Sequence, residues 1–578
     1  MNPGLFARPV LGLTDLSIAA AATPSPLSPQ LFMDNPIHPR YPELRALILE
    51  GASLRVAVPP NPGDPLPTRR RVQNHQSATT YATQIRALLA TDVAAGTTFV
   101  LDTLPPDWLA PGSGLFLCPI GAVLKSSSTP QNPVVRLIID ASHGGLQSLN
   151  SRITSHPPSS HEDPAFYLSA HNIASTLLAS GPNTLLSLSD VKSAFMNVAL
   201  HPSQFRFSAI AFDEKYYIQA RLGFGYASAP DIFDLPMSGF DTIQRVKHVP
   251  FLRIVDDILQ YAQPSVAKTL TDSLRADMAL YGLPRAVEKD INQQTVARFN
   301  GLLWDMPSLS VTIPPTRVQS ILSAISLAGR SNPTLFTVES VTGKLQSITC
   351  LVPGGKSHLQ YLYRVISITK QTVSTRPFTP AVTSRGMHEE LRWWLLRVSS
   401  IKPRPMAALA AELLPLPNPT FVFCDASGTG LGVFLPHSGE WTFMVIPAHF
   451  QISPITHTNK SESTGSTLIE VAAILLAIST FHHVFAGGQV QIYSDNTGAV
   501  GAFGRSHSPS PRIGNMITSA ISIATTHNFV LRVSWIPGVS NTIADPISRA
   551  NWPAFRVAAP SALPHPHIPV CSPFDSIR

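Results

Sequence analysis

The chain has 578 residues, too many for one hydrophobic core, so several domains are expected. Hydrophobic residues make up 44% of it, which permits real cores, and 54 prolines indicate proline-punctuated connections between domains. The formal net charge of +7 is compatible with a polyanionic partner without requiring one. Four widely separated cysteines without a CxxC pair indicate neither a zinc ribbon nor a disulfide framework.

The N-terminus has no basic segment followed by an uninterrupted apolar one, since Pro24, Pro26 and Pro29 interrupt its Ala-rich stretch. No run approaches about 20 consecutive apolar residues, so no membrane span is predicted. We therefore expect an intracellular protein, cytoplasmic or nuclear or both, with no membrane partner.

The N-terminal part mixes a low-charge arm with the first ordered elements. Residues 1 to about 40 are rich in Ala, Pro, Ser and Leu, which favours a flexible arm or a weakly ordered leader. The arginine run 69–71 lies in a proline-flanked loop that is either solvated or in contact with phosphates. Apolar spacing then predicts a helix over residues 77–91.

From Gly114 onward, short apolar runs alternate with turn signals and predict the strands of an α+β domain. These runs are GLFLCPIGAVLK, VVRLIID, LLSLSDV, YYIQARL and FLRIVDDILQYA. Residues 314–400 show apolar spacing at three and four, which predicts a mostly helical linker domain. A second α+β domain begins near Phe421, and the Pro-rich tail after Trp552 is expected to be extended.

Two adjacent aspartates, Asp256 and Asp257, lie inside the apolar run FLRIVDDILQYA, where an unpaired buried charge is unfavourable. Asp190 ends the run LLSLSDV in the same way. Neighbouring strands would bring the three carboxylates together to hold two Mg²⁺ ions roughly 4 Å apart. The alternative interpretation is that these acids are turn residues.

The blocks around these aspartates favour the first interpretation. VRLIIDAS, SDVKSAFMNVALHP, YYIQARLGFGYASAPDIF, IVDDILQYA, GLPRAVEKD and FNGLLWD resemble, in this order, the sequence blocks of retroelement reverse transcriptases. The resemblance implies that Asp190, Asp256 and Asp257 are the polymerase triad. Where the family usually has an aromatic residue this chain has Ile254, which implies altered primer contact or activity.

The same resemblance implies nucleotide-binding roles for five further residues. Phe195 becomes the aromatic gate below the sugar that excludes a 2′-hydroxyl, and Arg136 becomes a contact of the triphosphate. Phe224 and Gly225 fall where the family lines the nucleotide pocket, and Lys289 falls near the pyrophosphate leaving group.

A second set of acids follows in the C-terminal part. Asp425 lies within FVFCDASGTGLGVFL, an apolar strand, a glycine turn and a second strand, which resembles the start of a ribonuclease H-like sheet. Glu470 begins the helical run EVAAILLAIS, Asp495 ends the strand VQIYSD and Asp545 lies in SNTIADPIS. In that fold the four carboxylates hold two Mg²⁺ ions, and the resulting site cuts the RNA strand of a hybrid. The alternative is four unrelated surface acids.

The connecting stretch VTGKLQSITCLVPGGKSHLQYLYRV, with HEELRWWL, YSDNTGAV and SNTIADPISR, resembles the reverse transcriptase and ribonuclease H of DIRS-like retrotransposons. Such elements integrate through a separately encoded tyrosine recombinase, which is therefore an expected partner. Pararetrovirus-type polymerases have a similar order and stay an alternative. So does a decayed or domesticated copy that binds nucleic acid without catalysis.

We therefore predict a multidomain α+β enzyme, a right-hand polymerase of fingers, palm and thumb followed by a ribonuclease H-like α/β domain. The predicted function is RNA-directed DNA polymerase with ribonuclease H activity. The expected substrates and partners are an RNA template, a DNA primer, dNTPs and the RNA-DNA hybrid. The expected cofactor is Mg²⁺, with Mn²⁺ as the alternative. The predicted segments are an arm (1–73), fingers and palm (74–310), helical thumb and connection (311–412), ribonuclease H-like domain (413–552) and tail (553–578).

Overall fold

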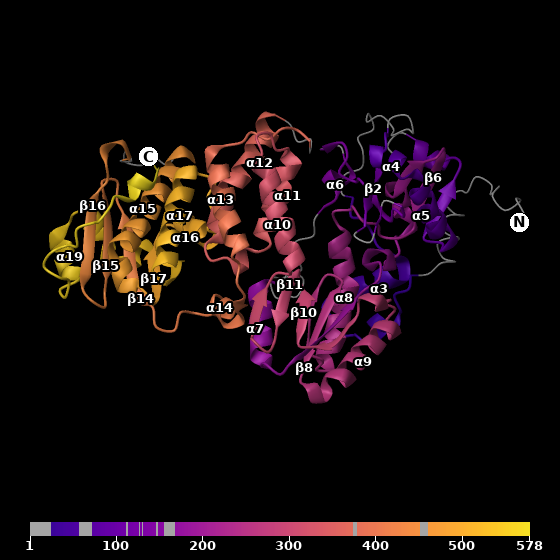
Figure 1. The fold of residues 1–578 in the computed structure, drawn as a ribbon, viewed down its shortest axis with the longest axis horizontal. Coiled ribbons are helices and arrows are strands. Elements are labelled where there is room, and N and C mark those ends of the chain that lie inside the picture. Colours follow the sequence, from indigo (N-terminus) through magenta and orange to yellow (C-terminus); the bar gives the residue numbers. More distant parts are fainter. Residues whose placement is uncertain are drawn as a thin grey trace, which may run out of the picture. The chain divides into compact units, whose positions relative to one another are not determined.

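The computed structural model divides into two compact units, Met1–Ser169 with Ala179–Asn300, and Ala170–Leu178 with Gly301–Arg578 (Figure 1). The structure describes residues 25–56, 72–110, 114–125, 128–129, 131–145, 148–154, 168–373, 378–450 and 460–577. The arginine run 69–71, expected either to be solvated or to contact phosphates, lies outside these residues.

The first unit is organised around an antiparallel sheet of strand order β7-β8-β4-β9. Helix α9 packs against β4, β8 and β9. The run FLRIVDDILQYA forms the hairpin β7–β8, so the predicted strand is confirmed as two strands. The elements are β4 (Leu185–Asp190), β7 (Phe251–Ile254), β8 (Asp257–Ala262), β9 (Ile291–Gln294), α8 (Ala229–Val246) and α9 (Pro264–Leu280). This sheet lies in the region predicted as the palm, and we call it the palm sheet.

The first unit also contains two smaller antiparallel sheets, one of order β1-β6-β5 and the hairpin β2–β3. The helix predicted over residues 77–91 is present as two helices separated at Tyr81. The strands are β1 (Thr98–Leu101), β2 (Ile120–Leu124), β3 (Val135–Ile139), β5 (Ala209–Phe212) and β6 (Lys215–Gln219). The helices and 3-10 turns are α4 (Gln76–Thr80), α5 (Ala82–Ala94), α6 (Leu149–Arg152), η1 (Pro106–Leu109), η4 (Ala194–Asn197), η5 (Pro202–Phe207) and η6 (Val287–Lys289), and strand β10 (Val296–Phe299) ends the unit.

The expectation of a flexible arm to about residue 40 is wrong from residue 25 onward. Helices α2 (Gln30–Met33) and α3 (Tyr41–Glu50) bury Leu31 and Leu44 completely in the core of the first unit. The Ser28 amide donates to the Tyr281 carbonyl at 3.0 Å, which fixes the segment beside α9. Apolar side chains thus decide the fold here despite the proline content.

The main segment of the second unit begins at Gly301, ten residues before the predicted boundary at 311, because the hairpin β11–β12 belongs to it. Four helices confirm the mostly helical content predicted for residues 314–400: α10 (Pro315–Ala328), α11 (Leu335–Gln346), α12 (Gln360–Thr372) and α13 (Arg385–Ser399). The shorter elements are α7 (Ala170–Ser180, mostly in this unit), η7 (Thr349–Leu351), η8 (Gly355–Leu359), α14 (Met406–Ala411), β11 (Leu302–Asp305), β12 (Ser310–Thr312) and β13 (Arg404–Pro405).

A five-stranded sheet of order β16-β15-β14-β17-β18 forms the rest of the unit. The first three strands are antiparallel, whereas β17 and β18 run parallel to β14. This mixed sheet with helices packed on it is ribonuclease H-like. Its elements are β14 (Thr420–Ala426), β15 (Gly430–Leu435), β16 (Glu440–Val445), β17 (Gln489–Ser494), β18 (Val530–Trp535), η9 (Ala448–Phe450), η10 (Gly538–Ser540), α15 (Lys460–Phe485), α16 (Thr497–Arg505), α17 (Pro511–Thr526) and α18 (Ala544–Ser548).

Helix α15 is the central core helix of this domain and packs against β14, β15 and α17. Its stretch Ser466–Phe485 is the one helix segment in the described part of the chain with the length and hydropathy of a membrane span. Yet 78% of that stretch is buried inside the protein. The domain core therefore accounts for its hydropathy.

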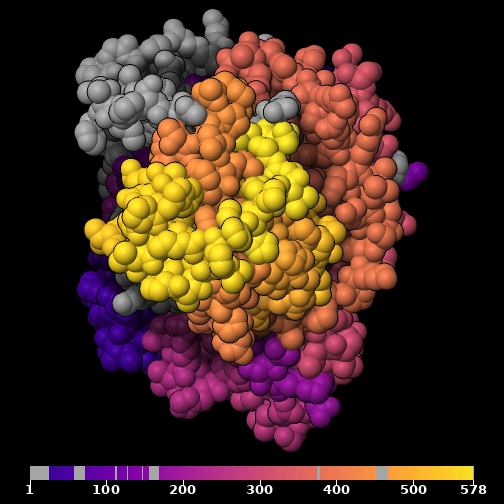
Figure 2. Space-filling model, turned by 90° about the vertical axis from the view of Figure 1, so that its left-hand side faces the viewer, coloured from indigo at the N-terminus to yellow at the C-terminus, as the bar shows by residue number. Residues whose placement is uncertain are grey.

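The tail after Trp552, predicted to be extended, is folded onto the ribonuclease H-like domain. It contains α19 (Trp552–Ala558) and η11 (Pro573–Ile577), and the His567 carbonyl accepts a hydrogen bond from Thr442 on β16 at 2.7 Å. Figure 2 shows this segment, in yellow, lying across the orange part of the same domain. The prediction was wrong because the tail carries Phe555 and Phe574, which are buried in the domain.

We expect Phe574→Ala to destabilise the ribonuclease H-like domain by about 3 to 5 kcal/mol, as other large core truncations do. Phe574 is 1% exposed and stacks on Phe450 with ring centroids 4.7 Å apart. Urea unfolding of the full chain measures the loss. Ile568→Ala in the same tail is the control, because Ile568 is 88% exposed and should change stability little. Equal stability of the two variants would contradict a tail integral to the core.

Candidate active sites

The first three predicted catalytic aspartates come together at one end of the palm sheet. Asp190 is the last residue of β4 and pairs across the sheet with Asp257, the first residue of β8. Asp256 precedes it in the β7–β8 turn, and its carbonyl accepts from the Val191 amide at 3.1 Å. Two strand ends and one tight turn therefore place all three carboxylates side by side.

This cluster is electrostatically strained. Burial raises the pKa of Asp257 to about 6, with further increases from Asp256 and Asp190. Burial and the nearby Asp190 likewise raise the pKa of Asp256. Lys289 in η6 donates to Asp190 Oδ2 at 2.8 Å, and this hydrogen bond raises the pKa of the lysine. The cluster thus lies where a cation lowers the free energy of the ionised carboxylates.

Three of the predicted nucleotide-binding side chains meet next to one another. The ring centroids of Phe195 and Phe224 are 5.0 Å apart, and the Arg136 guanidinium carbon lies 5.7 Å from the Phe224 ring centroid. Arg136 also lowers the pKa of Asp256 by its charge, although burial of Asp256 outweighs it. The aromatic pair, Arg136 and the aspartates are therefore parts of one neighbourhood.

The fourth, Gly225, is fixed by close backbone packing. Its φ is +112°, and a Cβ atom would lie 2.2 Å from the Ile139 carbonyl oxygen, so a side chain does not fit. Asn150 holds the same loop, since it donates to the Gly225 carbonyl and accepts from the Ala227 amide, both at 2.8 Å. Sequence reasoning missed Asn150, because its partners lie far along the chain.

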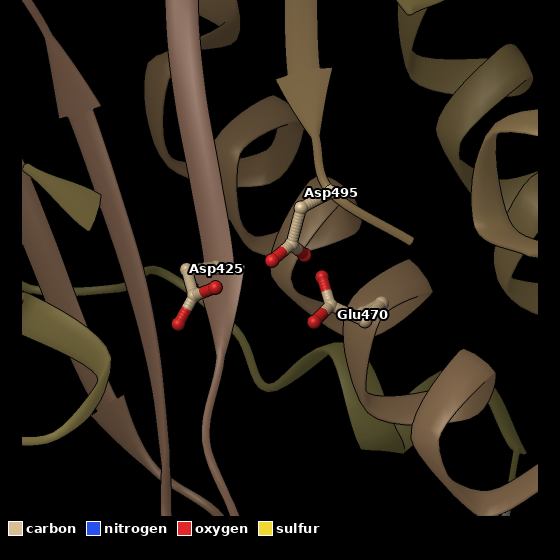
Figure 3. A group of neighbouring side chains, drawn as sticks. All are labelled: Asp425, Glu470 and Asp495. Carbon is tan, nitrogen blue, oxygen red and sulfur yellow. The ribbon is translucent and has the colours of Figure 1, made fainter. Parts of the chain in front are cut away.

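The second predicted set is brought together in part. Asp425 comes from β14, Glu470 from α15 and Asp495 from the end of β17, and one oxygen from each lies within 4.8 Å of the others (Figure 3). Asp545 lies in α18 outside this group, and Arg549 donates to its Oδ1 at 2.8 Å. Its charge nevertheless raises the pKa of Asp425 and Asp495, so it is close by.

Buried donors orient Asp425. The Ser548 hydroxyl donates to Asp425 Oδ2 at 2.5 Å, and Asn541 donates to the neighbouring Cys424 carbonyl at 2.9 Å. Both residues flank Asp545 in sequence, but nothing in their spacing predicts these contacts with β14. They were missed for that reason.

The carboxylates of this cluster also repel one another. Burial, and then the charges of Asp495 and Asp545, raise the pKa of Asp425 to about 6, although the Ser548 hydrogen bond opposes this. Burial raises the pKa of Glu470 well above its usual value, and Asp425 and Asp495 raise it further. An all-oxygen donor set of this kind fits a hard divalent cation such as Mg²⁺.

No protein-family model matches the chain, and no curated protein matches its sequence. Among solved structures it is similar to the foamy viral protease-reverse transcriptase in complex with an RNA/DNA hybrid. Identity is 13%, the TM-score is 0.43, and the match covers 92% of this chain and 64% of that one. The complex of the same viral protein with dsDNA matches at 14% identity and TM-score 0.43, over 92% of this chain and 98% of that chain. The chain thus spans just under two thirds of the first of these proteins.

We expect Glu470→Gln to stabilise the metal-free protein by roughly 1 to 2 kcal/mol at pH 8, because it removes a buried charge from a repelling cluster. The same variant should lose the part of the Mg²⁺-dependent increase in unfolding temperature that comes from the ribonuclease H-like domain. Thermal unfolding with and without Mg²⁺ measures both effects. Glu440→Gln on β16 is the matched control and should retain the response. Glu470→Gln with an unchanged response would refute metal binding by Glu470.

Proposed function

We propose that the chain is an RNA-directed DNA polymerase with a fused ribonuclease H, which copies retroelement RNA into DNA and degrades the RNA strand of the hybrid. One observation carries this proposal: two separate units each gather several partly or fully buried carboxylates around the strands of a sheet. Asp190 and Asp257 pair in the palm sheet, and Asp425, Glu470 and Asp495 group in the ribonuclease H-like domain. Making and cutting phosphodiesters both use such clusters.

In the polymerase site, Asp190, Asp256 and Asp257 would hold two Mg²⁺ ions, with Mn²⁺ as a substitute. When bound, the ions supply charge stabilisation at the transferring phosphoryl group. The positive charges of Lys289 and Arg136 suit the triphosphate of an incoming dNTP. The Phe195 ring contacts Phe224 in a tilted arrangement and Phe233 edge to face, and these two contacts would hold it where it excludes a 2′-hydroxyl at the sugar.

In the nuclease site, Asp425, Glu470, Asp495 and Asp545 would hold a second pair of ions. Bound there, such ions would supply an activated water and charge stabilisation at the leaving 3′ oxygen. The chain itself fixes Asp425 through Ser548, and it holds Asp545 next to a cation, Arg549. The substrates proposed are an RNA template, a DNA primer and their hybrid.

The element type is a further part of the proposal. We infer a DIRS-like retrotransposon, with a separately encoded tyrosine recombinase as the integration partner and work in the cytoplasm or nucleus. The motif VTGKLQSITCLVPGGKSHLQYLYRV and its neighbours support this choice over a pararetrovirus-type polymerase.

The matched variants Asp256→Asn and Asp425→Asn separate the two activities. We expect Asp256→Asn to reduce extension of a DNA primer on an RNA template at least about a hundredfold while the RNA strand is still cut. Asp425→Asn should do the reverse, since its carboxylate lies in the other unit. Labelled primer and labelled template, followed in one Mg²⁺-containing reaction, give both rates.

The native chain sets the decisive comparison. If it binds the hybrid but neither extends the primer nor cuts the RNA, the proposal fails and a binding-only, decayed copy takes its place. If both variants lose both activities, the two clusters do not act as separate sites.

A further inference from the structure

The turn that carries Asp256 contains a residue in an unfavourable backbone conformation. Ile254 pairs with Asp257, so Val255 and Asp256 are the two central residues of the β7–β8 hairpin turn. Val255 has φ +54°, a region that β-branched residues rarely adopt. A positive φ at the first central position is typical of a type II′ turn, where glycine is the usual residue. Something outside the turn must hold Val255 there.

Arg253, two residues earlier on β7, contacts this turn directly. Its Nη1 donates to the Val255 carbonyl at 3.1 Å. The side chain is 1% exposed, so water does not compete for this hydrogen bond. The other turn carbonyl, that of Asp256, is held by the Val191 amide next to Asp190. Both peptide groups that set the direction of the Asp256 side chain are therefore fixed.

Two aspartates of helix α8 hold the guanidinium of Arg253. Its Nε donates to Asp241 at 2.8 and 3.0 Å, and its Nη2 donates to Asp234 at 2.8 Å. Asp234 and Asp241 are seven residues apart, two turns of helix, so they lie on the same face of α8. Burial alone would lower the pKa of Arg253, but the two carboxylates more than offset this and raise it.

The planar guanidinium is essential to this arrangement. It presents donors in several fixed directions at once, whereas a lysine ammonium is a compact charge on a flexible stem. Arg253 uses separate nitrogens for Asp241, Asp234 and Val255. Lysine would keep the charge beside Asp241 but would not hold all three groups together.

We propose that Arg253, anchored by Asp234 and Asp241, is a positioning residue that keeps the Val255 turn in its left-handed conformation and so aims Asp256 and Asp257 at the metal site. This inference rests on the proposed polymerase function. Arg253 acts through the Val255 carbonyl and contacts no substrate group itself.

Hydrogen exchange of the turn tests the positioning without requiring catalysis. In Arg253→Lys, the amides of the peptide spanning residues 254–258 should exchange about tenfold faster than in the native chain. Asp277→Asn is the matched control, because Asp277 is also a buried carboxylate facing α8 but pairs with Lys247, away from the turn. It should leave exchange of the turn unchanged. Equal acceleration in both variants would overturn the proposal.

A double-substitution cycle tests the consequence for catalysis. Arg253→Lys should lower kcat for primer extension about 10- to 100-fold, with KM for dNTP changed less than about threefold. In a Val255→Gly background the same substitution should cost less than about threefold in kcat, since glycine adopts positive φ without a steric penalty. Equal losses in the two backgrounds would show that Arg253 only supports the fold, and would overturn the proposal.

The controls keep the outcomes distinct. If Arg253→Lys does not fold, Asp234→Asn replaces it, because that variant leaves the Asp241 pair intact and should give a smaller change in the same direction. A native chain that does not extend primers contradicts the proposed function. The exchange result then still decides whether Arg253 holds the turn.

Discussion

Carboxylates held close together with little exposure to water repel one another, and the rest of both sites is arranged around that repulsion. Asp190 faces Asp257 across neighbouring strands, and oxygens of Asp425, Glu470 and Asp495 lie within 4.8 Å. Burial removes water that would screen these charges. The free energy of the ionised carboxylates is therefore higher unless a cation binds. The scaffold must hold each side chain firmly enough that it does not turn away.

The two clusters meet this requirement with different chemistry. In the palm, positively charged side chains hold the carboxylates in place. Lys289 donates to Asp190, and Arg253 donates to the Val255 carbonyl in the turn that contains Asp256. In the ribonuclease H-like domain, a neutral hydroxyl donor, Ser548, orients Asp425, while Arg549 pairs with Asp545. A fixed ammonium beside the palm cluster matches the charge of a triphosphate. The neutral donor on Asp425 leaves the charge of that carboxylate available to a metal ion.

Local signals in the sequence were sufficient to predict the strands and to locate the acids on them. The apolar runs predict β4, β7 and β8, and these runs end at Asp190 or are interrupted by Asp256 and Asp257. The missed features depend on contacts between distant residues. Asn150 holds Gly225 from 75 positions away, and Ser548 reaches Asp425 over 123. No periodicity predicts such pairs. The arm from residue 25 and the tail were mispredicted because proline-rich composition masked a few buried apolar residues, Leu31 and Phe574 among them.

Both clusters are proposed to bind divalent cations, and anomalous diffraction from crystals of the full chain grown with Mn²⁺ shows directly whether they do. Mn²⁺ accepts the same oxygen ligands as Mg²⁺ and gives a measurable anomalous signal. We predict peaks beside Asp190, Asp256 and Asp257 and among Asp425, Glu470 and Asp495. Mn²⁺ peaks elsewhere, with none at either cluster and the carboxylates within hydrogen-bonding distance of one another, would contradict metal binding by the two clusters.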